Sequence, residues 1–141
     1  MLVVQVNRDL ASTIKTFFER SQFEVTLADK GKEAADILRE TPHFDIVLID
    51  LSSHGSNSLD LLTLIRRMSV GTPVLAFVPR NDDAGAVRCL ELGADDCLVG
   101  PFGMNLLAAH VRAILRRTAV RHHNLNPRNL TKHAIAPPIN S

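Results

Sequence analysis

The chain has little of what marks several large protein classes. Its 141 residues include no Trp, no Tyr and only two cysteines, and Cys89 and Cys97 form neither a CxxC pair nor a disulfide framework. No apolar run reaches the ~18–20 residues that span a bilayer, and residues 1–8 lack the features of a secretory signal. These absences argue against a disulfide scaffold, a membrane protein and a secreted protein. We expect a cytoplasmic protein whose two cysteines are small core residues.

The chain also lacks a large excess of charge of one sign. Lys and Arg number 16 and Asp and Glu number 15, which gives a net charge of +1. Residues 118–141 contain Arg121, Arg128 and Lys132 but no acid, so this segment carries +3 and the rest of the chain −2. A DNA-binding domain normally has a dense basic stripe or a recognisable reading helix. Contact with DNA is therefore expected only through this basic tail or through an output domain outside the chain.

What the sequence does contain is a five-fold alternation of short apolar runs with amphipathic segments. Residues 46–49 are apolar without interruption, as in a strand buried on both faces. Strands that alternate with helices imply right-handed crossovers and a parallel sheet. The predicted fold is one doubly wound α/β domain over residues 1–117, a (βα)5 arrangement with a five-stranded parallel sheet and helices on both faces. The predicted strands are 2–6, 23–28, 44–50, 73–78 and 96–99, and the predicted helices are 10–20, 30–40, 57–68, 82–92 and 104–117.

Local signals support these boundaries. Asp9 is available as the N-cap of the first helix, and Gly93 occupies the position of a left-handed C-terminal cap after the fourth. After Arg117 the apolar periodicity stops, and Pro137 and Pro138 follow in a polar context. Residues 118–141 are predicted to be a flexible basic tail or the remnant of a linker.

Four short motifs occur in a fixed order on the five-fold pattern. They are Phe44-Asp45-Ile46-Val47-Leu48-Ile49-Asp50, Thr72-Pro73-Val74-Leu75, Gly93-Ala94-Asp95-Asp96 and Gly100-Pro101-Phe102. Together they resemble the receiver domain of bacterial two-component response regulators, with its CheY-like, flavodoxin-like fold, over residues 2–117. The ending, residues 113–117, is most similar to receivers of the winged-helix (OmpR/PhoB-type) transcription factors.

The resemblance implies a role for Asp50 as the equivalent of the phosphoacceptor, which takes a phosphoryl group from a histidine kinase. Asp50 closes an apolar strand, and ligands of open parallel sheets bind at the carboxyl ends of strands where the strand order reverses. Judged from the residues alone, an aspartate at this place caps a turn equally well. The residue before Pro101 is Gly100, which allows the cis peptide bond that the family has there.

The rest of the family's active site is largely replaced. Mg²⁺ prefers carboxylate oxygens, so we expect Mg²⁺ binding to be lost or very weak and phosphoryl transfer to be very slow. We further expect Arg8 to pair with Asp50 in place of the metal; the alternative is that Arg8 points to solvent. The replaced positions are Asn7 and Arg8 for an acidic pair, with Asp9 one place too late, Val78 for a hydroxyl residue, Gly100 for a lysine and Cys97 for an aromatic residue.

In the winged-helix receivers, the fourth helix, the fifth strand and the fifth helix form a charged dimer face. This chain keeps part of it and makes part of it apolar, which predicts a modified homodimer or partner surface. The alternative is that these are ordinary surface residues. The charged positions that match are Glu91, Asp96 and Arg112, whereas Ala86 and Leu106 replace a pair of charges and His110 replaces an arginine.

No motif indicates other chemistry. There is neither GxGxxG nor GxxxxGK[ST], and the histidines of the tail do not have zinc-ligand spacing. Ser52, Ser53 and His54 lack a nucleophile elbow. The first interpretation is therefore a non-enzymatic, atypical receiver without cofactor, which acts through protein contacts largely independent of phosphorylation. The alternatives are a phosphoacceptor that reacts slowly at Asp50, and the regulatory domain of a DNA-binding transcription factor that lacks its output domain.

Overall fold

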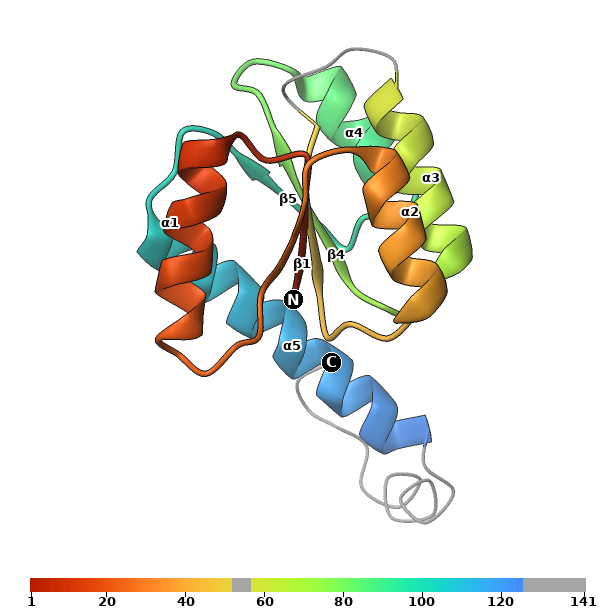
Figure 1. Cartoon of the computed structure of the whole chain (residues 1–141). Coiled ribbons are helices and arrows are strands. Elements are labelled where there is room, and N and C mark those ends of the chain that lie inside the picture. The colour runs from red at the N-terminus through yellow and green to blue at the C-terminus, as the bar shows by residue number, and fades with distance from the viewer. Residues whose placement is uncertain (52–56, 126–141) are drawn as a thin grey trace, which may run out of the picture.

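The computed structural model describes residues 1–51 and 57–125 and has one five-stranded parallel sheet (Figure 1). The strand order is β2-β1-β3-β4-β5, so the order reverses between β1 and β3. This confirms the predicted doubly wound α/β fold. The strands are β1 (Leu2–Val4), β2 (Thr26–Ala28), β3 (Val47–Asp50), β4 (Val74–Val78) and β5 (Asp96–Val99). The helices are α1 (Arg8–Glu19), α2 (Gly31–Glu40), α3 (Asn57–Met68), α4 (Asp83–Glu91) and α5 (Met104–Leu125).

Helices cover both faces of the sheet. Helices α1 and α5 lie on one face, and α2, α3 and α4 lie on the other (Figure 1). Successive residues of a strand point to opposite faces, so Leu48 belongs to the α1/α5 core whereas Val47 and Ile49 belong to the α2/α3/α4 core. This alternation explains why the third strand is apolar at every position before Asp50.

The start of the first helix differs from the prediction. β1 ends at Val4 because Gln5 has a φ of 61°, which takes the chain out of the extended conformation. The N-cap is Asn7 and not Asp9, since the Asn7 side-chain oxygen accepts a hydrogen bond of 2.9 Å from the Leu10 N–H. Asp9 instead lies in the first helical turn, where its negative charge interacts favourably with the positive end of the helix dipole.

The end of the last helix was also predicted wrongly. α5 continues to Leu125 and extends past the amino ends of the strands (Figure 1), so residues 118–125 are helical and not an irregular tail. No Gly or Pro occurs between Gly103 and Pro127, so nothing interrupts this helix. The Thr118 hydroxyl donates to the Ile114 carbonyl at 3.0 Å. The predictions for residues 126–141, and those for Ser52, Ser53 and His54, lie outside the described residues.

The end of α4 confirms the glycine cap. Gly93 has a φ of 111°, its N–H donates to the Leu90 carbonyl, and the Ala94 N–H donates to the Cys89 carbonyl. These two bonds form a Schellman motif, which satisfies carbonyl groups that the helix end leaves without partners.

Candidate functional site

Asp50 lies in a pocket at the carboxyl edge of the sheet. It is the last residue of β3, and its exposed fraction is 6%. The pocket has a volume of about 420 Å³, with mostly apolar walls. Its position beside the reversal of strand order is the place where doubly wound sheets bind ligands. The lining residues are Asn7, Leu10, Asp50, Phe77, Val78, Pro79, Gly100, Pro101 and Phe102.

Three loops hold the walls of this pocket. Asn7 is held by its capping bond to α1. The Gly100 N–H donates to the Val78 carbonyl at 3.0 Å, which keeps the end of β5 against the end of β4. The bond between Gly100 and Pro101 is cis, as predicted, and the Phe77 and Phe102 rings lie 4.8 Å apart between centroids. The structure thus brings Asn7, Val78, Gly100 and Pro101 together around Asp50, and neither Arg8 nor Asp9 is among the lining residues.

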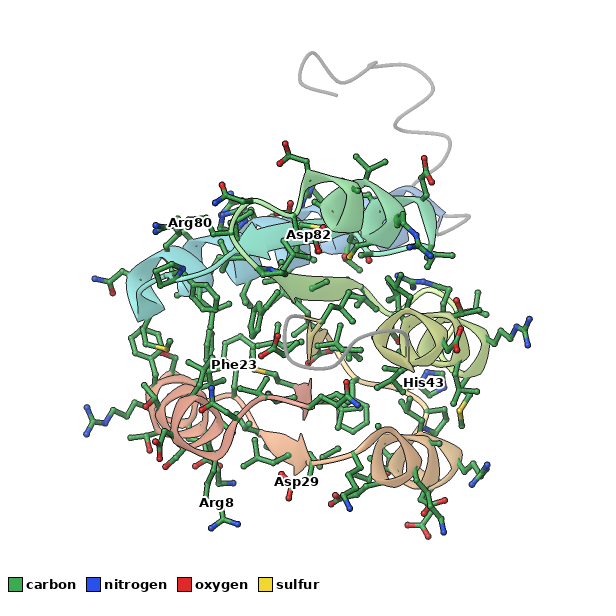
Figure 2. The ribbon with its side chains drawn as sticks, turned by 90° about the horizontal axis from the view of Figure 1, so that it is seen from above. Arg8, Phe23, Asp29, His43, Arg80 and Asp82 are labelled. Atoms are coloured by element: carbon green, nitrogen blue, oxygen red, sulfur yellow. The ribbon has the colours of Figure 1, made fainter. Side chains whose placement is uncertain are left out.

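Arg8 does not take part in this pocket, so the predicted Arg8–Asp50 pair is wrong. Arg8 is exposed and points outward from the start of α1 (Figure 2). It lines a separate hollow with Ser12, Lys15 and Asp29. Residues spaced by four and seven along a helix share a face, so Arg8 lies with Ser12 and Lys15 on the flank of α1.

The ion pairs support the same correction. In residues 1–51 and 57–125, none joins Arg8 to Asp50. The solvent-facing alternative for Arg8 therefore holds. The pairs present are Lys15–Glu19, Asp36–Arg39, Arg66–Asp95 and Asp96–His110.

The residues that directly follow β1 are Gln5 and Val6, which the sequence analysis did not single out. Val4 pairs with Ile49 in the sheet, so Gln5 is one step further along, level with Asp50. The Gln5 side-chain oxygen is buried without a hydrogen-bond partner among the described residues. Val6 is buried in the α1/α5 core. β1 stops at Val4, so Gln5 and Val6 directly follow the strand, and Asn7, which lines the pocket, comes two residues later.

The pocket offers few donor atoms of the kind that Mg²⁺ binds. Among the described lining residues, Asp50 supplies the one carboxylate and Asn7 supplies an amide whose oxygen already caps α1. Mg²⁺ demands near-octahedral oxygen coordination and is usually held by one or two carboxylates together with its waters and substrate phosphates. Across the described part of the chain, no group of three or more His, Cys, Asp or Glu side chains could hold a metal ion.

A second candidate surface is formed by α4, β5 and α5. β5 is the edge strand, with α4 packed on one side and α5 on the other. Asp96 and His110 join within one chain, with 2.8 Å between the carboxylate Oδ2 and the imidazole Nδ1. Ala86 is partly buried against the α2/α3/α4 core, whereas Leu106 is exposed. The structure thus brings Asp96 and His110 together.

Further side chains complete this surface. Glu91 and Arg112 are exposed. The same three elements also expose large apolar side chains that were not predicted from the sequence. A single apolar residue at an exposed position does not stand out in the apolar pattern of its helix or strand. These are Val87 and Leu90 on α4 and Val99 on β5, in addition to Leu106 on α5, which was already named.

Known proteins resemble this chain in sequence and in structure. A family model described as the response regulator receiver domain matches residues 1–112. The chain belongs to the response regulator receiver family. Among solved structures, the receiver domain of a Francisella response regulator is 31% identical, with a TM-score of 0.71, and covers 83% of this chain and 96% of that one. A two-component response regulator of Clostridium difficile has 26% identity and a TM-score of 0.74 over 82% of this chain and 94% of that one.

The curated relatives of this receiver are longer proteins. The transcriptional regulatory protein CpxR of Escherichia coli is 37% identical over 118 residues, which are 84% of this chain and 50% of that protein. The CpxR homolog of Haemophilus influenzae is 36% identical over 126 residues, 89% of this chain and 54% of that protein. The receiver therefore spans about half the length of the curated relatives that it matches. No helix in the described residues is long and apolar enough to cross a bilayer.

Proposed function

We propose that this receiver works as an atypical, cytoplasmic regulatory module that acts through protein contacts and largely without phosphorylation. It is a binding module and not an enzyme. The surface of α4, β5 and α5 would carry its contacts, and Mg²⁺ binding at Asp50 would be lost or very weak.

The observation that carries this proposal is the set of side chains around Asp50. Phosphoryl transfer depends on cations and hydrogen-bond donors that neutralise the charge developing on the phosphoryl oxygens. Asn7, Val78 and Gly100 line its pocket, and Gln5 follows β1 at the level of Asp50. None of these four residues brings a carboxylate, a hydroxyl or an amine. They therefore supply neither a carboxylate ligand for the metal nor a positive charge for the phosphoryl oxygens.

The test is phosphorylation with a small-molecule donor. The full chain is incubated with Mg²⁺ and acetyl phosphate and its intact mass is measured. We expect the mass to stay unchanged. Addition of one phosphoryl group that disappears in Asp50→Asn would overturn the proposal in favour of a working phosphoacceptor.

A restored variant serves as the matched control. Gln5→Asp, Val78→Thr and Gly100→Lys together return a carboxylate, a hydroxyl and an amine to the pocket. A side chain at position 100 meets open space, since nothing lies within 4 Å of the Cβ that it would add. Val6 is left unchanged because an aspartate there would place a charge in the α1/α5 core. We expect this variant to gain the phosphoryl group under conditions that leave the native chain unmodified.

A second candidate function, a slow phosphoacceptor served by a histidine kinase, is favoured by the place of Asp50 itself. The carboxylate ends β3 inside a pocket beside the strand-order reversal. A slow reaction would give a fraction of phosphorylated chain that grows over hours and depends on Asp50. The time course of the same assay separates this candidate from the first.

A third candidate is the regulatory part of a DNA-binding transcription factor. It is supported by the names of the curated relatives and by the half of their length that this chain matches. Direct binding by the basic residues after 117 would give DNA retention that falls steeply with salt. Loss of that retention on deleting residues 118–141 would support the tail version, and retention unaffected by the deletion would contradict it.

A further inference from the structure

The two cysteines of the chain lie together between α4 and β5. Cys89 is in α4 and is fully buried, with an exposed fraction of 0%. Cys97 is in β5, is partly exposed and packs against the core cluster that contains Cys89. The Cys97 thiol contacts the Ala86 carbonyl at 3.6 Å, one helical turn before Cys89. The prediction of two core cysteines is thus confirmed for Cys89, and Cys97 packs against the same core but is partly exposed.

Strand alternation places these thiols on the same side of the sheet. Leu98 belongs to the α1/α5 core, so its neighbour Cys97 faces the opposite layer, where α4 lies. Interaction with the Cys97 side chain raises the pKa of the Cys89 thiol, and interaction with the Cys89 side chain lowers the pKa of the Cys97 thiol. The partly exposed thiol is therefore also the one that ionises first.

We propose that Cys89 and Cys97 form a reversible oxidation site, which a hydroperoxide converts to an intrachain disulfide. The order follows from access, because an oxidant reaches Cys97 from solvent and reaches buried Cys89 only through it. The reactive species in such chemistry is the thiolate of an accessible cysteine beside a second, resolving cysteine.

The reaction balances without a further reactant. The Cys97 thiolate attacks the terminal oxygen of the hydroperoxide, the O–O bond breaks, and the leaving alkoxide takes a proton to become an alcohol. Cys97 is then a sulfenic acid. The Cys89 sulfur attacks the Cys97 sulfur, the S–S bond forms, and the hydroxide that leaves combines with the Cys89 proton as water. Two thiols are oxidised and one peroxide bond is reduced.

A disulfide here would change the surface of α4, β5 and α5, and this part rests on the proposed function. Closing the bond brings the sulfurs to about 2.05 Å, closer than any non-bonded contact. Cys89 lies between Val87 and Leu90, which α4 exposes at 53% and 48%. Drawing α4 toward β5 at Cys89 would therefore shift both apolar side chains relative to Leu106. The oxidised receiver would bind its protein partner with a different affinity from the reduced one.

The experiment measures the thiols of the full chain directly. Reduced protein is treated with hydrogen peroxide, quenched, unfolded and alkylated with a maleimide, and its intact mass is recorded. We expect a monomer that has lost two hydrogen atoms, takes up no maleimide and recovers both thiols with dithiothreitol. Two maleimides after treatment, oxygen added without S–S formation, or a disulfide between two chains would each overturn the proposal.

Two variants report the order of the steps. In Cys89→Ala we expect a sulfenic acid on Cys97 that dimedone traps, and in Cys97→Ala we expect Cys89 to remain a thiol under the same treatment. If either variant folds poorly, the mass measurement on the native chain tests the proposal alone. The dissociation constant of self-association is then compared for reduced and oxidised protein. Equal constants would overturn the proposal that oxidation changes the binding surface. The mass readout decides the oxidation site even if the receiver proves not to associate.

Discussion

The Arg66 guanidinium of α3 lies 3.0 Å from the Asp95 carboxylate in the turn before β5. Arg66 also donates to the carbonyls of Thr72 and Gly93. The Asp95 oxygen that meets Arg66 accepts a second bond of 2.7 Å from the Val74 N–H. One arginine thus ties α3 to the start of β4 and to the end of α4, which leads into β5 and the thiol pair.

Arg66→Met should destabilise the chain by about 2–3 kcal/mol, because it removes several hydrogen bonds from a charged donor while keeping the aliphatic stem. Urea unfolding followed by circular dichroism measures the change. Arg67→Met is the matched control, since Arg67 is exposed on the same helix, and its effect should stay within about 0.5 kcal/mol. Equal effects of the two substitutions would contradict the role given to Arg66.

Gly93→Ala should cost more than the same change at two other glycines. Gly93 has a φ of 111°, and an added Cβ would lie 3.1 Å from the Arg66 Nε. Gly71 has a φ of 90° with open space around it, and Gly100 meets neither restriction. We expect about 1–2 kcal/mol for Gly71→Ala from the backbone alone, more for Gly93→Ala, and little change for Gly100→Ala. Melting temperatures of the three variants test this order, and an effect at Gly93 no larger than at Gly100 would contradict it.

Alkylation of Cys97 should extend to lower pH than for an ordinary thiol. Interaction with the Cys89 side chain lowers the pKa of Cys97 from its ordinary value of 9.0, although burial acts in the opposite direction. The thiolate is the reactive form, so the midpoint of the rate of iodoacetamide labelling against pH should lie below 9.0. Mass spectrometry of quenched samples gives the rates.

Substitution of Cys89 separates this interaction from other causes. Cys89→Ala removes the thiol, so the pKa of Cys97 and the labelling midpoint should both rise. Cys89→Ser keeps a hydroxyl in the same place, so its midpoint should lie below that of Cys89→Ala. Identical midpoints in the two variants would show that burial and charge, and not the thiol pair, govern Cys97.

Leu106→Glu should weaken self-association of the full chain at least tenfold, because it puts a charge among the apolar side chains of α4, β5 and α5. Light scattering over a concentration series measures the effect. Val70→Glu is the control: Val70 is exposed at 84%, more than Leu106 at 49%, but lies in the turn between α3 and β4. A monomer at every concentration, or equal weakening by both substitutions, would contradict the proposed dimer face.

Much of the candidate site could be predicted because the strand ends could be found. Asp50, Val78, Gly100 and Pro101 each follow or end an apolar run, and parallel strands bring their carboxyl ends to one edge of the sheet. Gln5 was missed for a related reason. The apolar pattern continues through Val6, and a backbone turn at Gln5 leaves no mark in such a pattern.

The sequence by itself determined the order of strands and helices, the glycine cap after α4 and the membership of Asp50 in the pocket, because periodicity and local sterics act within a few residues. Only the tertiary structure decided that Arg8 turns away from Asp50, that Arg66 reaches Asp95, and that Cys89 and Cys97 meet. Each of these relations depends on the angle at which a side chain leaves its element and on how two elements pack. A linear pattern of residues contains neither quantity.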